Sequence, residues 1–296
     1  MSFRAYADGY LGWSKAHKRS WTTDRSCLTR ILAVFGERKL DEISSAEVER
    51  FRDQLLEGEA AVSPATTNRY RALLSGMFRR AIRLGLVTSN PVKGVQPFKE
   101  ANERVMCLTA EQEAAIREAL APEHRPLFTV SVHTGLRWSE QVGLRWRDVD
   151  ILARVITIQR SKNGQTRRVP MNSVVRAIAL ELGSGRQRPD DPSEPVFVCR
   201  HAQADKFFPK AVGRGQAALR LAGKDASRLD GYTWHGNRHT FASRLVMRGV
   251  DLRTVQELGG WRTLGMVQRY SHLDPEHLHA AVERLVAQDA AELARN

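Results

Sequence analysis

Apolar side chains recur at helical spacing through the first third of the chain. Helix-like patterns cover about Phe3–Ala16 and Thr23–Phe35, because apolar positions three and four residues apart share one face of a helix. A third helix is marked by an S-x-x-E capping box that opens at Ser44. A fourth runs from Pro64 to Leu84, starting on a proline and stopping before a glycine. These signals predict a four-helix bundle without strands.

The periodic pattern breaks after Asn90-Pro91. Residues 93–104 contain glycine and proline and show no sustained period, which is typical of a linker. The sequence therefore predicts a helical domain over residues 1–92 and a second domain over residues 105–296. The length of 296 residues also favours two domains, since domains of about 100–200 residues are the most common.

The second domain mixes helical and strand patterns. Pro126–His133 is a short apolar helix. Val155–Gln159 is β-branched and strand-like, Asn163-Gly164 is a strong hairpin signal, and Arg167–Met171 supplies the return strand. After a loop the chain returns to helices, and the last of them starts near Pro275. We expect this domain to be mainly helical with a small antiparallel β-sheet.

Net charge adds a partner to this picture. The chain carries 46 basic and 33 acidic residues, a net charge of +13. The excess is shared, with 16 basic and 10 acidic side chains in residues 1–97 and 30 and 23 in the remainder. Such an excess favours a polyanion, most commonly nucleic acid, and its presence in both parts favours two DNA-contacting domains. For the helical segment alone, a generic bundle with a solvated basic face explains the charge equally well.

Cysteine usage and the N-terminus bear on the compartment. Cys27, Cys107 and Cys199 lie far apart and form neither a disulfide framework nor a zinc-ligand spacing. The N-terminus has no apolar stretch like that of a signal peptide, and no apolar run approaches the roughly 20 residues that span a bilayer. We expect a cytoplasmic protein without membrane association.

Four short segments of the second domain concentrate residues that suit phosphate chemistry. They are T-G-L-R-W-S-E at residues 134–140, R-S-K-N-G at 160–164, H-G-N-R at 235–238, and L-G-G-W at 258–261 followed nine residues after its tryptophan by Tyr270. Each alone has a structural explanation: an arginine after a glycine caps a helix, a lysine flanks a turn, and a histidine and arginine three apart share a helix face. A tryptophan after two glycines anchors a core, and a tyrosine fills one. Chance does not readily place all of them in one order.

In that order and spacing the segments resemble the tyrosine recombinases, also called the phage integrase family. The family pattern has an arginine in T-G-x-R-x-x-E, a lysine on a β-hairpin, H-x-x-R, and a histidine or tryptophan nine residues before a nucleophilic tyrosine. The resemblance covers the whole chain, since a helical core-binding domain precedes the catalytic domain in the family. It implies a helical core-binding bundle plus a mixed α/β catalytic domain, which together form a clamp on DNA.

The resemblance implies an enzyme that cuts and rejoins DNA through a covalent intermediate. Tyr270 attacks the scissile phosphorus and leaves a 3′-phosphotyrosyl bond and a free 5′-hydroxyl, so the energy of the phosphodiester is kept. Negative charge gathers on the non-bridging oxygens, and Arg137 and Arg238 stabilise it because a guanidinium presents a planar fork to two oxygens. Since the bond energy is stored in the phosphotyrosine, no metal, ATP or other cofactor is expected.

Proton transfer falls on the remaining members of the pattern. Lys162 is expected to be the general acid for the 5′-oxygen, and His235 takes the tyrosine proton or hydrogen-bonds to the phosphate. Trp261 stands where many members have histidine, and its indole N–H can donate to a phosphate oxygen but cannot carry a proton. Glu140 is expected to brace the arginines. Neighbouring side chains compete for the position of Lys162: Arg160, Arg167 and Arg168. Three further matches to common family letters are assigned to packing and hydrogen bonding: His239, Thr240 and His272.

The resemblance also implies partners and a biological role. The L-G-G-W segment and the residues around Tyr270 resemble integrases of phages and mobile elements more than chromosome-dimer resolvases, in which L-G-H is usual. We therefore expect integration or excision of a mobile element through a Holliday junction. Four copies of a protein that is monomeric in solution would join two double-stranded recombination sites, with accessory DNA-bending or directionality factors, at the bacterial nucleoid. Many such integrases begin with an arm-binding domain. Because the first predicted helix starts at Phe3, we expect that domain either to be absent from this protein or to have been removed from this chain.

DNA contacts of the helical domain are expected from the helix Pro64–Leu84. Contact with phosphate is favoured over base reading, because cationic side chains most often bind the backbone. The candidates are Asn68, Arg69, Arg71, Arg79, Arg80 and Arg83.

Two other functions share parts of this pattern. A type IB topoisomerase uses a similar site but relaxes supercoils as a monomer. The N-terminal bundle favours a recombinase, and relaxation of a plasmid that lacks recombination sites separates the two. A catalytically silent DNA-binding protein derived from a recombinase is disfavoured by the complete set of site residues. Formation of a protein–DNA adduct on a nicked suicide substrate tests that alternative.

Overall fold

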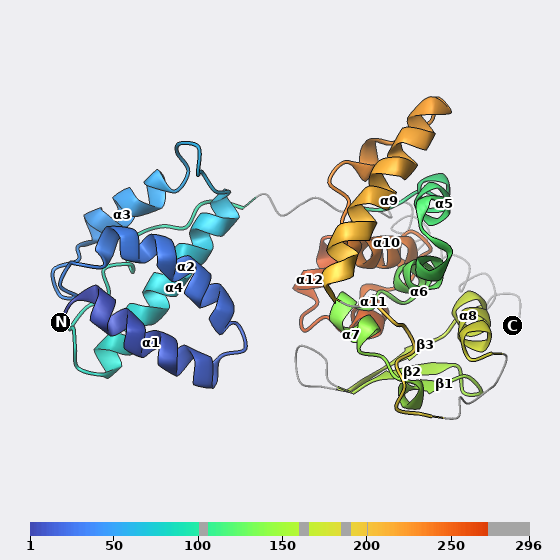
Figure 1. Cartoon of the computed structure of the whole chain (residues 1–296), viewed down its shortest axis with the longest axis horizontal. Helices are drawn as coiled ribbons and strands as arrows, with labels where there is room; N and C mark the ends of the chain where they lie inside the picture. Colours follow the sequence, from blue (N-terminus) through green and yellow to red (C-terminus); the bar gives the residue numbers. More distant parts are fainter. Residues whose placement is uncertain (101–105, 160–165, 185–190, 200, 272–296) are drawn as a thin grey trace, which may run out of the picture. The chain divides into compact units, whose positions relative to one another are not determined.

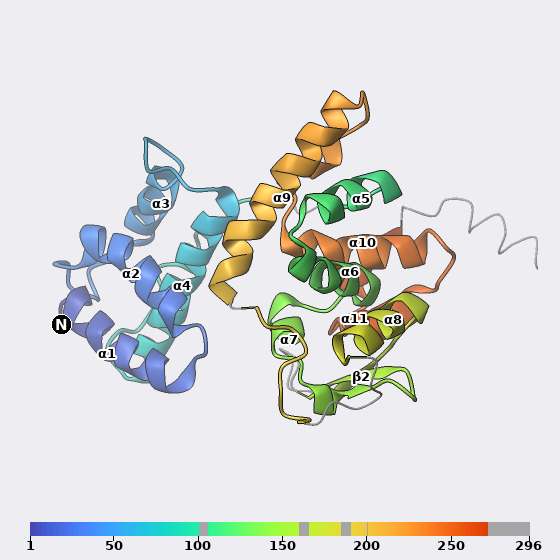
Figure 2. The same ribbon diagram turned by 45° about the vertical axis from the view of Figure 1, so that its right-hand side comes forward.

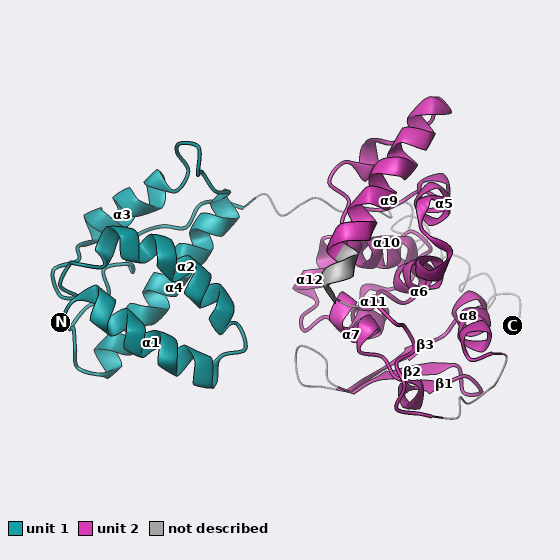
Figure 3. Cartoon of the chain, viewed as in Figure 1, with its two compact units in different colours: residues 1–102 teal, residues 103–296 magenta. Residues whose placement is uncertain are grey.

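The computed structural model describes residues 1–100, 106–159, 166–184, 191–199 and 201–271 (Figure 1, Figure 2). The chain divides into two compact units, residues 1–102 and residues 103–296 (Figure 3). Helices dominate both, and a small sheet belongs to the second. This confirms the predicted fold class, mainly helical with a small antiparallel sheet. None of the helices in these ranges is both long and apolar enough to cross a membrane.

Unit 1 contains the four predicted helices: α1 (Phe3–His17), α2 (Trp21–Phe35), α3 (Ser45–Gln54) and α4 (Pro64–Arg83). The predicted start signals are present. The Ser44 backbone N–H donates to the Glu47 carboxylate (2.9 Å), and the Ser44 hydroxyl accepts from the Glu47 backbone, which completes the capping box. The Ser63 hydroxyl caps the first turn of α4. The helices bury their apolar faces in a common core rich in aromatic rings.

The segment that follows α4 packs back on the bundle. Val92 and Val95 are buried in the core of unit 1. The Asn68 side chain forms two hydrogen bonds with the backbone of Phe98, donating at 2.8 Å and accepting at 2.9 Å, and Arg71 Nε donates to the Val95 carbonyl. Unit 1 therefore includes residues that the sequence assigns to the linker, because Val95 of that segment is buried with the helices.

Unit 2 is built around α6. Its helices are α5 (Ala110–Ala119), α6 (Arg125–Thr134), α7 (Trp138–Val142), α8 (Ser173–Leu182), α9 (His201–Leu221), α10 (Trp234–Val246), α11 (Leu252–Gly259) and α12 (Gly265–Gln268), with short 3-10 turns at Pro122–His124, Trp146–Asp148 and Ser227–Leu229. Helix α6 contacts α5, α7, α8 and α10, and in both views it lies beside α10 (Figure 1, Figure 2). Its side chains are buried almost throughout, with Phe128 fully enclosed. This arrangement sets the end of α6 against α10, where two of the four predicted site segments meet.

The sheet consists of β1 (Val149–Asp150), β2 (Val155–Ile158) and β3 (Arg167–Pro170), antiparallel in the order β1-β2-β3. The predicted β2–β3 pairing is confirmed, with Ile158 opposite Arg167. Strand β1 has two residues, too few for an alternating pattern to reveal it. The expected Asn163-Gly164 turn lies outside the described residues.

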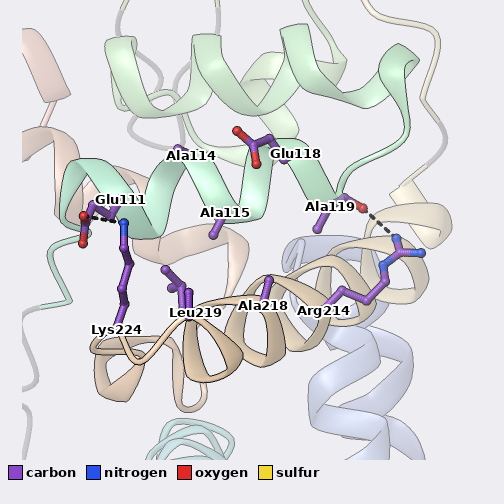
Figure 4. Close-up of a pocket in the computed structure, with 10 residues that line it drawn as sticks. Glu111, Ala114, Ala115, Glu118, Ala119, Arg214, Ala218, Leu219 and Lys224 are labelled. Atoms are coloured by element: carbon purple, nitrogen blue, oxygen red, sulfur yellow. Dashed lines mark hydrogen bonds and ion pairs between the residues drawn. The ribbon is translucent and has the colours of Figure 1, made fainter.

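Helix α9 packs along α5 (Figure 4). A Cβ at Gly215 would lie 3.1 Å from the backbone of α5, so the absence of a side chain permits this close approach. A groove runs between the two helices, with a link at each end: Lys224 Nζ lies 2.8 Å from Glu111 Oε1, and Arg214 Nη2 donates to the Ala119 carbonyl at 2.8 Å. The pair is thus joined by contacts at both ends of the groove.

Candidate active site

Unit 2 brings together five of the six residues that the sequence predicts to be catalytic: Arg137, His235, Arg238, Trp261 and Tyr270. They come from the start of α7, from α10, and from the chain after α11 and α12. The sixth, Lys162, lies outside the described residues. The cluster therefore joins segments that are more than 130 residues apart in the sequence.

Arg137 is placed by a tight turn after α6. Gly135 ends that helix with a φ of +61°, and a Cβ there would lie 2.5 Å from the Phe241 ring, so a side chain would meet both strain and overlap. Arg137 then precedes α7, and its backbone N–H donates to Glu140 at 3.0 Å. Its guanidinium donates to Glu140 Oε1 at 2.7 Å and to the Gly260 carbonyl at 3.2 Å. The residue thus begins the following helix and does not close the preceding one.

Glu140 binds two arginines at once. Besides Arg137, it accepts two hydrogen bonds from Arg167 of β3, at 2.9 and 2.8 Å. Burial alone would raise the pKa of Glu140, but the hydrogen bonds and charge of Arg167, with those of Arg137, lower it to about 2. A buried carboxylate held in this way fixes the positions of both guanidinium groups. Removing the carboxylate or its partner arginines is costly, because an uncompensated buried charge would remain. Glu140 therefore has the contacts of the predicted brace.

Arg238 is the most deeply buried cation of the cluster, with 2% of its surface exposed. Its Nη1 donates to the Gly135 carbonyl at 2.7 Å, and its guanidinium carbon lies 3.9 Å from the centre of the Trp261 ring. Burial, followed by the charges of Arg137 and Arg167, lowers the pKa of Arg238 to about 9. Its Nη2 is buried and has no hydrogen-bond partner within the described part of the chain. A buried, unpaired cationic N–H is costly, and an anionic ligand would relieve that cost.

Two glycines make room for Trp261. Gly260 has a φ of +65°, and a Cβ at Gly259 would lie 1.8 Å from the Trp261 ring. The indole is half-buried and packs with Tyr270, their ring centroids 6.1 Å apart. Trp261 therefore anchors the packing of this region, which is the structural role that its position after two glycines suggested. Its ring is also the surface against which the Arg238 guanidinium packs.

Tyr270 is enclosed by the cluster. Only 1% of its surface is exposed, and burial raises its pKa to about 12 although the charges of Arg269 and Arg238 act in the opposite direction. Its hydroxyl lies 2.7 Å from Nδ1 of His239. A phenol in this setting stays protonated at neutral pH, so its ionisation needs a base.

The two histidines of α10 lie one turn apart, with ring centroids separated by 5.1 Å. His235 is exposed and His239 is half-buried. Burial, then the charges of His235, Arg269 and Arg238, lowers the pKa of His239 to about 4, so this ring is neutral near pH 7. The hydrogen bond of the Tyr270 hydroxyl is made with His239, whereas the sequence assigned the possible acceptance of that proton to His235.

Two contacts of the site were not predicted from the sequence. His239 was expected to pack and hydrogen-bond, and its i, i+4 spacing from His235 was the available signal that both rings share one face of α10. Arg167 was named only as a competitor of Lys162, and no local pattern reveals its pairing with Glu140. Thr240 does hydrogen-bond, accepting from the Leu108 backbone at 3.1 Å.

The residues expected to contact DNA from α4 fall into two groups. Asn68 and Arg71 are bound to the segment 92–100, and the Arg80 guanidinium carbon lies 4.3 Å from the centre of the Trp13 ring. The other three are exposed to solvent: Arg69, Arg79 and Arg83. Their contact with DNA stays a prediction.

Among the residues that the structure describes, no group of three or more His, Cys, Asp or Glu side chains is placed to hold a metal ion.

Comparison with known proteins identifies relatives of both units. The model of the phage integrase family matches residues 102–277, and that of the phage integrase N-terminal domain matches residues 11–99. Tyrosine recombinase XerC of Rhodospirillum centenum is 32% identical over 282 residues, an alignment that covers 88% of this chain and 79% of the relative.

Solved structures share the fold. The Tn1549 transposon integrase in complex with circular intermediate DNA superposes with a TM-score of 0.75 at 22% identity, over 95% of this chain and 99% of that one. A lambda integrase tetramer bound to a Holliday junction gives a TM-score of 0.67 at 18% identity, over 89% of this chain and 78% of that one.

Proposed function

Since the chain belongs to the phage integrase family, the tyrosine recombinases, we propose that it integrates or excises a mobile element through a 3′-phosphotyrosyl intermediate and a Holliday junction. The observation that carries the proposal is the arrangement around Tyr270. Two arginines and a tryptophan converge beside a buried tyrosine hydroxyl that is already hydrogen-bonded to a neutral imidazole.

The arginines supply the phosphate site. Arg238 is fixed by the Gly135 carbonyl and by the Trp261 ring, which leaves its buried Nη2 available for a non-bridging oxygen. Arg137 is held by Glu140 at one end of its guanidinium. Preorganised donors in a poorly hydrated site stabilise developing negative charge better than water does, since they need not reorient during the reaction. Trp261 adds an indole N–H, and His235, exposed on α10, provides a further hydrogen bond to the phosphate.

The chemical step follows from these positions. The Tyr270 oxygen forms a bond to phosphorus while the bond from phosphorus to the 5′-oxygen breaks. We assign the protonation of that 5′-oxygen to Lys162, as its sequence position between β2 and β3 suggests. Reversal of the same step by a 5′-hydroxyl of another strand rejoins the DNA, and no external energy source enters.

The assembly we propose is a tetramer on two paired double-stranded sites, formed from monomers. The solved lambda integrase tetramer on a Holliday junction supports it through the shared fold. The two units would then close on the duplex as a clamp. Accessory DNA-bending or directionality factors and a place at the bacterial nucleoid in the cytoplasm belong to the same proposal. The mobile-element role has support from the Tn1549 integrase fold and from the L-G-G-W segment.

Covalent capture tests the proposed function. DNA flanking the gene provides candidate attachment sites. A nick placed beside the cleavage position traps the covalent intermediate, because the short fragment that carries the free 5′-hydroxyl diffuses away and cannot rejoin. We expect a protein–DNA adduct with the natural protein and none with Tyr270→Phe, which keeps the ring and removes the nucleophile. An equal amount of adduct with the phenylalanine variant would contradict the assignment of the nucleophile.

A further inference from the structure

His239 makes a contact with the nucleophile that the sequence did not assign to it, since acceptance of the tyrosine proton was assigned to His235. Its Nδ1 lies 2.7 Å from the Tyr270 hydroxyl, a short hydrogen bond, and the two ring centroids are 5.8 Å apart. The geometry points to His239 as the catalytic residue that accepts the proton of Tyr270 during cleavage and returns it during rejoining. This inference rests on the proposed function, because it concerns the same chemical step.

The direction of this hydrogen bond depends on the tautomer of His239. The proposal requires the tautomer in which Nδ1 carries the lone pair and accepts from the Tyr270 hydroxyl, so that the proton of the neutral ring resides on Nε2. Tyr270 has almost no exposed surface, so bulk water has little access to its hydroxyl. A base already in contact with the nucleophile is therefore the direct route for the proton.

His235 is less suited to that role. It lies one turn earlier on α10, it is exposed, and its ring faces the His239 ring at 5.1 Å. Within the described residues, the hydrogen bond of the Tyr270 hydroxyl is made with His239. The two histidines thus divide the work: His235 can approach the phosphate, and His239 holds the nucleophile.

Burial, followed by the charges around His239, lowers its pKa and explains how it stays neutral before DNA binds. His235 and Arg238 face it from α10, and Arg269 faces it from the segment that carries Tyr270. These groups disfavour a protonated imidazole. The scissile phosphate brings negative charge to the same place and offsets them, so the ring becomes a stronger base when substrate arrives. Ionisation of Tyr270 is thereby linked to the presence of DNA.

The step balances. During cleavage the Oη–phosphorus bond forms, the phenolic proton moves to Nδ1 of His239, and the 5′-oxygen leaves with a proton from the general acid that we assign to Lys162. During rejoining the imidazolium returns its proton to Oη as the tyrosine leaves. One residue serves as base in one direction and as acid in the other.

The variant His239→Asn distinguishes two roles of His239: a base that takes the Tyr270 proton, and a group that only positions the hydroxyl. Its side-chain carbonyl can accept the hydrogen bond near the position of Nδ1, but it has almost no basicity. We expect the rate of adduct formation on a nicked suicide substrate to fall about 100-fold or more, the usual contribution of a general base. DNA affinity should change about twofold or less. A near-natural rate with His239→Asn would overturn the proposal, since positioning alone would then suffice.

A substrate with sulfur in place of the 5′-bridging oxygen sharpens the test. A thiolate leaves without a proton, so this substrate should restore cleavage by Lys162→Ala but not by His239→Asn. Rescue of the histidine variant would overturn the assignment. His235→Asn is the matched control, and it should retain the acidic limb of the pH–rate profile that His239→Asn loses. His239→Gln repeats the measurement if the asparagine variant does not fold.

Failure of the proposed function gives a different result. In that case the natural protein would form no adduct on either the oxygen or the sulfur substrate. The role of His239 would fall with it.

Discussion

Three arginines of α4 and two of the candidate active site are the same residue type in different environments. Arg69, Arg79 and Arg83 extend into solvent from a helix of unit 1. Arg137 and Arg238 are held by carboxylate, carbonyl and aromatic partners inside unit 2. An exposed guanidinium gains affinity for phosphate that salt screens, while a buried and oriented one acts on charge that develops during a reaction. The difference predicts that the basic side chains of this chain serve two purposes, and that the position of each decides which one it serves.

The largest expected effect comes from removing an arginine of the candidate active site. Arg238→Ala or Arg137→Ala should slow adduct formation about 1000-fold or more, because each takes away a preorganised donor to the phosphate. Single-turnover cleavage at saturating protein measures this, and a gel-shift titration measures affinity. The affinity of either variant for DNA should change only several-fold. Arg79→Ala is the control from α4, and its cleavage rate at saturating protein should not change. If affinity and cleavage rate fell in parallel, Arg137 and Arg238 would only hold DNA, and the contrast with the arginines of α4 would be wrong.

A smaller effect is expected from the carboxylate that orients the cluster. Glu140→Gln should lower the free energy of unfolding by about 3 kcal/mol at pH 7, since it leaves Arg137 and Arg167 without their buried counter-charge. The folded pKa of Glu140, about 2, lies below its ordinary value of 4.5. Its contribution is therefore fully present above pH 4.5 and is lost as the pH falls toward 2.

Denaturant unfolding of both proteins at pH 7, 4.5 and 3 checks this prediction. The gap between natural protein and variant should narrow on acidification. Glu257→Gln is the matched control, because Glu257 pairs with Arg253 on the exposed surface of α11 and such pairs contribute little. A gap that stays constant with pH would show that the loss comes from packing and not from charge.

The smallest effect is expected on α4. The double variant Arg79→Ala/Arg83→Ala should weaken DNA binding several-fold at low salt. It should also reduce the slope of log affinity against log salt by about 0.9 for each DNA phosphate that the variant no longer neutralises. Cleavage at saturating protein should not change. Arg4→Ala, an exposed arginine paired with Glu37, serves as the control. An unchanged slope in the double variant would remove these residues from the DNA surface.

Local signals in the sequence were enough for most elements of the fold. The capping box at Ser44, the proline that begins α4, and the β-branched run of β2 each act through neighbours a few residues away, so a linear pattern can reveal them. Val95 is buried in the core of unit 1, and its carbonyl accepts a hydrogen bond from Arg71 of α4. Contacts between residues so far apart in the sequence have no local signature.

The same distinction applies to the candidate site. Spacing within motifs predicted which residues would gather around Tyr270, and the five described members do lie together. Spacing could not predict which histidine of α10 would meet the hydroxyl, because that depends on how the segment after α11 folds back. The pairing of Arg167 with Glu140 joins a strand to a helix start, and only the tertiary fold creates it. The role of Lys162 stays a prediction.

The near-contact between Gly259 and the Trp261 ring has a consequence for the substitutions that this site can accept, because a Cβ at Gly259 would lie 1.8 Å from that ring. The side chains at the two positions therefore fill one space. A smaller residue in place of Trp261 alone would leave a void, and a larger residue in place of Gly259 alone would overlap the indole ring. Substitutions at the two positions are tolerated best when they are made together.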